Sequence, residues 1–117
     1  MAEKRDLDRH RKRFIISFGP DEPEFKAFTE DISTTGLFIK TAKTYPPGSR
    51  LLVQLELDEQ RKVLMETRVM WAKKVPPQMI HLVKKSGMGV RIIRFVSGEA
   101  YYCELCEELS LPYAELL

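Results

Sequence analysis

The sequence has few of the residues on which metal and redox chemistry depend. It contains two histidines, His10 and His81, and two cysteines, Cys103 and Cys106, in 117 residues. A structural zinc site needs about four such ligands, and here the histidines lie far from the cysteines along the chain, so we expect no metal site. The C-x-x-C pair also lacks the βαβ context of a redox motif. We therefore expect two buried or half-buried structural thiols.

Long apolar runs and catalytic signatures are also missing. No apolar stretch approaches the ~18–20 residues that cross a bilayer. The start of the chain is charged from Glu3 onward, without the apolar region of a secretory signal. We expect a cytoplasmic protein that does not insert into membranes. Because the chain contains no G-x-S-x-G, no phosphate-cradling glycine loop and no paired carboxylates with a plausible cleft, we expect no enzyme.

Charge of one sign is in small excess. Nineteen Lys and Arg residues face seventeen Asp and Glu residues, which gives a net charge of +2, too little for non-specific coating of nucleic acid. Residues 1–13 hold six basic and three acidic residues, so the excess is local. We interpret this segment as a flexible basic N-terminal arm that meets an anionic partner of limited size.

Alternating apolar residues predict six short strands with turns between them. The expected strands are residues 14–18, 25–31, 37–41, 53–57, 63–71 and 90–95. Six strands at such spacing are typical of a small antiparallel barrel or sandwich. We expect one domain over residues 14–117, with the barrel at about 14–95. Trp71 falls on the apolar face of its strand, so we expect it in the core or at the core rim.

The period changes after the last strand. Tyr102, Leu105, Cys106 and Leu109 stand at i, i+3, i+4 and i+7, which predicts a helix over about residues 97–109. Pro112 is expected to limit its continuation, leaving a short tail.

Two short motifs near the start of the chain carry binding chemistry. Residues 9–13 contain the spacing R-x-x-x-R, with Arg9 and Arg13 at its ends, and residues 31–36 read D-x-S-x-x-G. Guanidinium groups bind phosphates and guanine edges in paired, planar fashion, and a carboxylate accepts from guanine N1 and N2. The motifs suit a guanine nucleotide. Taken alone, the arginine spacing is better explained by a solvated basic tail, and the D-x-S-x-x-G motif is explained equally well by a Ser- or Asx-type turn.

Together these segments resemble the PilZ domain, a bacterial receptor module for cyclic di-GMP. The resemblance runs from about Arg9 to Phe95 and rests on residues 9–14, 31–39, 68–71 and 87–92. It implies a six-stranded antiparallel β-barrel of Greek-key type with a C-terminal helix. It also implies a role in motility or exopolysaccharide regulation.

The resemblance also implies the ligand contacts. Arg9 and Arg13 would grip guanine edges and phosphates, Asp31 would accept from a guanine, and Ser33 would contact phosphate or base. Gly36 would keep the surface open. Cyclic di-GMP would draw the arm across the barrel, and an effector protein would read the new surface. The chain would need no cofactor and would be a monomer or a ligand-linked dimer.

Two other interpretations stay open. A ligand-independent adaptor would bind a motility or secretion component through its barrel and helix. A small-barrel binder of single-stranded nucleic acid would instead place aromatic residues on an exposed sheet face beside basic residues. Phe14, Phe18 and Phe25 fall in inward register, which argues against the second of these.

Overall fold

The fold is described here from a computed structural model that covers residues 13–29, 31–73 and 86–116, the last seven by backbone only. Within these residues the chain forms six strands followed by one helix. In chain order the strands are β1 (Phe14–Gly19), β2 (Phe25–Thr29), β3 (Gly36–Lys40), β4 (Arg50–Glu56), β5 (Lys62–Lys73) and β6 (Gly87–Ser97), and the helix is α2 (Glu99–Leu116).

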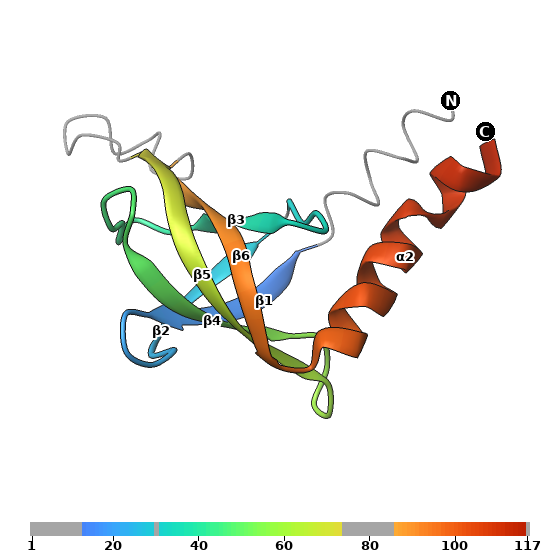
Figure 1. The fold of residues 1–117 in the computed structure, drawn as a ribbon, viewed down its shortest axis with the longest axis horizontal. Coiled ribbons are helices and arrows are strands. Elements are labelled where there is room, and N and C mark those ends of the chain that lie inside the picture. Colours follow the sequence, from blue (N-terminus) through green and yellow to red (C-terminus); the bar gives the residue numbers. More distant parts are fainter. Residues whose placement is uncertain (1–12, 30, 74–85, 117) are drawn as a thin grey trace.

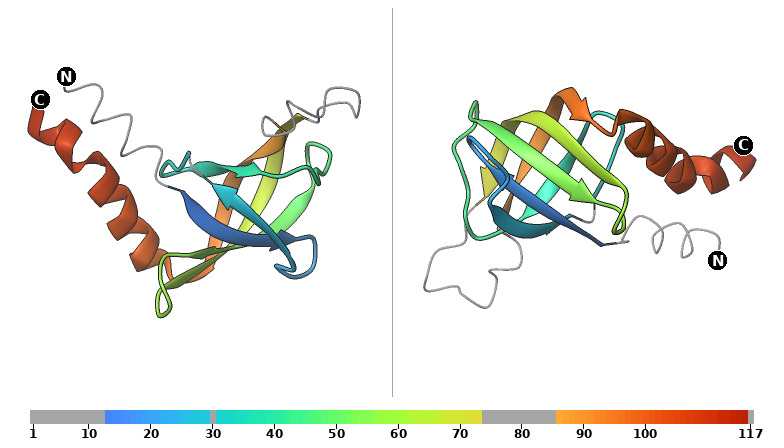
Figure 2. Two further views of the ribbon diagram at one scale, coloured as in Figure 1. Left: turned by 180° about the vertical axis from the view of Figure 1, so that it is seen from behind. Right: turned by 90° about the horizontal axis from the view of Figure 1, so that it is seen from below.

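The strands close into an antiparallel barrel with the order β1-β2-β3-β6-β5-β4 (Figures 1 and 2). The segment β4-β1-β2-β3 is a Greek key, because the fourth strand returns to lie beside the first. Closure gives every strand two neighbours, although β2 and β3 share a single register pair, Phe28 with Lys40. The prediction of a six-stranded Greek-key barrel with a C-terminal helix is confirmed.

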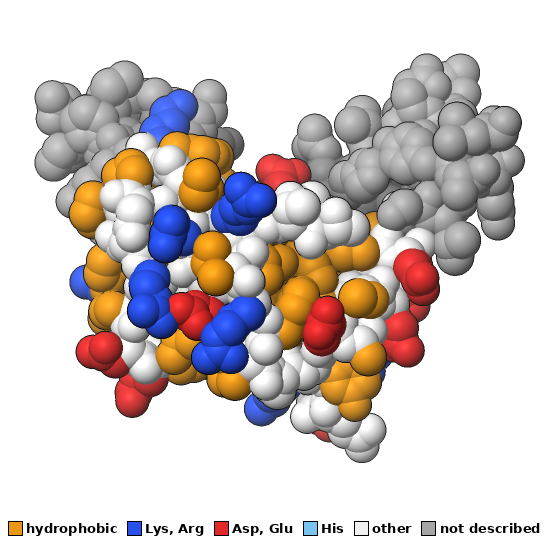
Figure 3. All heavy atoms as spheres, in the orientation of Figure 1, with side chains coloured by type: hydrophobic (Ala, Val, Ile, Leu, Met, Phe, Trp, Pro, Cys, Tyr) orange, Lys and Arg blue, Asp and Glu red, His pale blue; other side chains and the backbone are white. Residues whose placement is uncertain are grey.

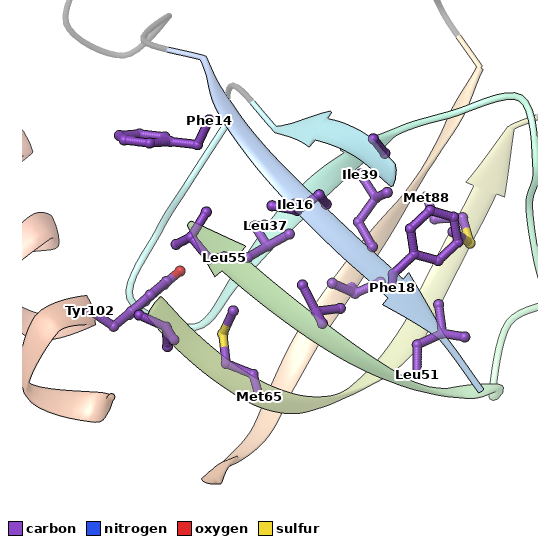
Figure 4. Packing of buried hydrophobic residues seen from close by; sticks show 14 of the residues in the cluster. Phe14, Ile16, Phe18, Leu37, Ile39, Leu51, Leu55, Met65, Met88 and Tyr102 are labelled. Carbon is purple, nitrogen blue, oxygen red and sulfur yellow. The ribbon is translucent and has the colours of Figure 1, made fainter. Parts of the chain in front are cut away.

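Alternation along the strands fills the barrel. Inward positions of β4, and of β5 up to Val69, are buried, while the residues between them face outward. In β1 the inward residues are buried and Ser17 between them is buried as well. Figure 4 shows the inward side chains meeting at the barrel axis, with Ile16 and Phe18 among them. Phe14 is also buried and Phe25 packs against the core, as their register predicted.

Strand β5 departs from regular alternation near its end. Its pairing with β6 shifts register between Val69 and Trp71, the mark of a β-bulge. Val69 is buried, but Trp71 is turned outward and is 50% exposed. The prediction that Trp71 lies in the core or at the core rim is therefore wrong, because one extra residue in the strand reverses the faces that follow it.

Helix α2 begins directly after a sharp junction with β6. Gly98 has a φ of +81°, and a Cβ there would lie 2.3 Å from the Lys62 carbonyl oxygen, so only glycine fits this corner. The carbonyl of Gly98 accepts from the Tyr102 amide at 3.2 Å. The helix therefore begins at Glu99, two residues later than predicted.

The helix also ends later than predicted. It continues through Pro112 to Leu116, since one missing amide donor does not terminate a helix whose neighbouring residues favour helical backbone. Tyr102, Leu105 and Cys106 are buried against the barrel, and the far end of α2 points away from it (Figure 1). Cys106 is buried as expected, whereas Cys103 is exposed. No helix within the described residues is long and apolar enough to cross a membrane.

Candidate functional site

The D-x-S-x-x-G motif forms a tight turn between β2 and β3. The Ser33 hydroxyl accepts from the amides of Thr35 (3.3 Å) and Gly36 (3.2 Å), and it donates to the Gly36 carbonyl at 3.2 Å. The Phe38 amide donates to the Asp31 carbonyl at 3.1 Å and closes the hairpin. A hydroxyl has one proton and two lone pairs, so these bonds fill the capacity of Ser33. The Asp31 carboxylate is exposed and has no side-chain partner among the residues that the structure describes.

Helix α2 anchors this turn through one buried side chain. The Tyr102 hydroxyl donates to the Ser33 carbonyl at 2.6 Å and lies 3.4 Å from the Gly36 carbonyl. Its ring packs against Phe95, with centroids 5.4 Å apart, and only 2% of the residue is exposed. Figure 4 shows Tyr102 reaching from the helix toward the barrel. Burial raises the pKa of Tyr102, so the phenol keeps the proton that it donates.

A pair of aromatic rings lies on the outer surface beside the turn. Phe38 of β3 and Trp71 of β5 are both register partners of Gly89 on β6. The two rings reach over this glycine and stack, with centroids 5.5 Å apart and planes at 22°. A Cβ on Gly89 would lie 2.2 Å from the indole nitrogen. Glycine in the central strand therefore makes room for the aromatic pair.

The turn and the aromatic pair border one groove of about 1040 Å³. Three residues of the predicted site line it: Asp31, Ser33 and Gly36. Two cationic residues, Arg91 and Lys73, line it as well. Helix α2 contributes Leu109 to the lining. The groove thus combines a carboxylate, a hydroxyl, an aromatic surface and two cations.

The sequence interpretation missed Phe38, Trp71, Lys73 and Arg91 as groove residues. For Arg91 a signal existed, because Val90 points inward and Arg91 must then point outward beside the next strand. For Trp71 there was no comparable signal, since the bulge that turns it outward depends on pairing with β6.

Gly36 has a structural role that the sequence did not reveal. A Cβ at this position would lie 2.2 Å from the Val90 carbonyl oxygen on β6. The glycine thus permits close approach of β3 and β6 at the edge of the groove. The requirement for glycine here comes from strand packing, independently of any ligand.

Of the two arginines in the R-x-x-x-R motif, the structure describes only Arg13. Arg9 lies outside the described residues. Arg13 directly precedes β1, whose first pair is Phe14 with Thr29, two residues before Asp31. The end of the arm and the D-x-S-x-x-G turn therefore share one end of the barrel. Arg13 does not line the groove. Its guanidinium carbon lies 5.0 Å from the centre of the Phe28 ring.

Comparison with known proteins agrees with this architecture. The PilZ domain family model matches residues 3–105. The solved structure of the Bacillus subtilis inhibitor of motility (MotI/DgrA) is similar in fold, with a TM-score of 0.67 and 19% sequence identity. The similarity covers 86% of this chain and 48% of that one, so this chain spans about half the length of its structural neighbour. Among curated proteins no significant match is found.

Proposed function

Because the chain belongs to the PilZ domain family, we propose that it binds cyclic di-GMP in the groove and acts as an adaptor toward another protein. The observation that carries this proposal is the meeting of Asp31, Ser33 and the Phe38–Trp71 pair in one groove. The proposed role is binding, with a change of protein contacts as its output and no catalytic step.

The groove chemistry suits each part of a guanine dinucleotide. The Asp31 carboxylate would accept from guanine N1 and N2, and the exposed indole of Trp71 would stack on a base. Arg91 and Lys73 would offset phosphate charge. Small-molecule sites typically enclose about 300–1,000 Å³, so the volume of about 1040 Å³ is sufficient for a ligand of this class.

Ligand binding would require Ser33 to exchange one hydrogen bond. To donate to a phosphate, its hydroxyl must release the Gly36 carbonyl. That carbonyl would keep another donor, since the Ser33 amide donates to it at 2.9 Å. The exchange therefore leaves the Gly36 carbonyl with a donor and costs little free energy.

Arg13 would also give up a contact. One of its interactions is the cation–π contact with the Phe28 ring, worth about 0.5–1 kcal/mol at exposed sites. Charge-assisted bonds to a phosphate are stronger, so the ligand would draw Arg13, and Arg9 with it, over the groove. The displaced arm would alter the surface that an effector meets.

Isothermal titration calorimetry with cyclic di-GMP tests the proposal. We expect Arg9→Ala and Arg13→Ala each to weaken binding by about 2–4 kcal/mol, because each leaves anionic groups of the ligand unpaired. Lys26→Ala, on the exposed face of β2, is the control and should bind normally. Unchanged affinity of the double variant Arg9→Ala/Arg13→Ala would show that the arm does not contact the ligand. Absence of binding to the wild-type protein would refute cyclic di-GMP as the ligand.

A ligand-independent adaptor is the second candidate, and two observations favour it. The bonds of Ser33 and the steric need for Gly36 both explain motif residues through folding alone. A melting curve separates the two roles, because a ligand that binds the native state raises the midpoint. A midpoint indifferent to cyclic di-GMP would support the adaptor role.

A further inference from the structure

Three arginines stand side by side across neighbouring strands on the outer face of the barrel. Arg50 of β4 is the register partner of Arg68 on β5, which is the partner of Arg91 on β6. Like charges directly opposite each other destabilise a sheet. The arrangement is therefore unfavourable unless an anionic group lies over it.

One acidic residue, Glu66, lies within this face and neutralises only part of its positive charge. Glu66 pairs with Arg50 and accepts from the Arg94 Nε at 2.8 Å. Its side chain is 13% exposed, so its carboxylate is largely covered by these partners. Arg68 and Arg91 have no acidic partner in the part of the chain that the structure describes. Both residues are exposed, and no hydrogen bond to another described residue occupies their guanidinium donors.

Apolar side chains are exposed between the arginines. Met70 is 51% exposed and Ile93 is 47% exposed. Together with Arg68, Arg91 and Ile92 they border a shallow hollow of about 300 Å³. Figure 3 shows Lys and Arg side chains gathered over β5 and β6, with hydrophobic side chains exposed among them. Arginine and methionine are enriched at protein interfaces.

We infer that this arginine face, made of Arg50, Arg68, Arg91 and Arg94 around Met70 and Ile93, docks a protein segment that presents carboxylates around an apolar anchor. The carboxylates would pair with Arg68 and Arg91, and the anchor would enter the hollow. The inference extends the adaptor role of the proposed function by giving the chemistry of the partner.

A protein fits this face better than a nucleic acid does. Met70 and Ile93 offer no ring on which a base could stack. The net charge of the whole chain is only +2, well below that of a typical polyanion binder.

The face and the groove share Arg91. A nucleotide phosphate at Arg91 would take one of the two available guanidinium groups from the face. We therefore expect cyclic di-GMP to weaken docking, so that the free protein is the form that holds its partner.

A selection of random peptides tests the inference without knowledge of the partner. A displayed library of 16-residue peptides is panned against the immobilised full chain, with and without cyclic di-GMP. We expect the recovered peptides to be rich in Asp and Glu around an apolar residue. Arg68→Glu should weaken their binding about tenfold or more, with a steep salt dependence, while Lys26→Glu on β2 should change it little. Because Arg68 does not line the groove, nucleotide binding should survive this substitution.

Additional variants and ligands distinguish the possible results. Ile93→Ser should weaken the same peptides if an apolar anchor enters the hollow. Recovery of no peptide, of peptides without acidic enrichment, or of peptides indifferent to Arg68→Glu overturns the inference. Binding of a labelled 30-nucleotide poly-dT that depends on Arg68 would assign the face to nucleic acid instead. If acidic peptides bind but cyclic di-GMP has no effect and does not bind, the docking face stands and the proposed nucleotide function fails.

Discussion

Single residues of the D-x-S-x-x-G turn serve the fold and the groove together. Ser33 closes the turn through its hydroxyl, and its carbonyl holds helix α2 through Tyr102. Gly36 permits β3 to approach β6. A loss of binding after mutation of this turn therefore has two possible causes, and stability must be measured beside affinity.

Removing the Tyr102 hydroxyl isolates the contact between the helix and the turn. Tyr102→Phe keeps the buried ring but deletes the donor to the Ser33 carbonyl. We expect the free energy of unfolding to fall by about 0.5–1.5 kcal/mol, the net value of one hydrogen bond, measured by urea denaturation. The control is Tyr101→Phe, since Tyr101 is exposed. Equal stability of both variants would mean that this bond contributes nothing to the fold.

Adding one methyl group at Gly36 tests its role in strand packing. In Gly36→Ala the new Cβ would meet the Val90 carbonyl oxygen at 2.2 Å, so β3 and β6 must move apart. We expect a loss of about 1–3 kcal/mol in unfolding free energy, as for other overpacked sites, with or without ligand. Thr34→Ala, at an exposed position of the same turn, should change stability little. A fully stable Gly36→Ala protein would refute the steric account.

At the scale of elements, alternation predicted the strands because it depends only on which face is buried. It could not predict the bulge in β5, since a bulge depends on how two strands pair and leaves the composition of either strand unchanged. The end of the helix was also predicted too early, at about residue 109 in place of Leu116. Proline is unfavourable in a helix, but its effect is outweighed when the residues on both sides stay helical, as they do up to Leu116.

The bulge makes the single tryptophan of the chain a reporter of the groove. Trp71 is half exposed and lines the groove beside Phe38. We expect a base stacked on the indole to quench Trp71 emission in proportion to occupancy, measured by fluorescence titration with cyclic di-GMP. Asp31→Asn should shift the titration to higher ligand concentration, because the amide cannot accept equally well from guanine N1 and N2. GMP serves as the control ligand. Binding seen by calorimetry without any change in emission would place the nucleotide away from the aromatic pair.

At the scale of the whole molecule, barrel closure brings distant segments to one end. Asp31, Trp71 and Arg91 come from three separate parts of the sequence and meet at the groove because β3, β6 and β5 are neighbours. The sequence motifs located one wall of this groove. The opposite wall follows from strand order, which local patterns do not specify. The same order places the arginine face next to the groove.

The arginine face also gives the fold a defined acid sensitivity through Glu66. The hydrogen bond from Arg94, followed by the charge of Arg50, lowers the pKa of Glu66 below its ordinary value, which is about 4.3 in unfolded chains. A carboxyl whose pKa is lower in the folded state stabilises the fold above the unfolded-state pKa. That stabilisation is lost as pH falls through the folded-state pKa.

We therefore expect Glu66→Gln to lower the melting midpoint at pH 7, where the ionised carboxylate separates Arg50 and Arg94. The difference from the wild type should shrink as the pH is lowered and disappear below the folded-state pKa, because both proteins then carry a neutral group at this position. Added salt should reduce the difference at pH 7, since the Arg50 and Arg94 side chains are largely exposed to solvent. Glu59→Gln, an exposed carboxylate in the β4–β5 turn, is the matched control and should melt like the wild type at each pH. A difference for Glu66→Gln that persists unchanged into acid would show that side-chain shape, rather than charge, stabilises this part of the barrel.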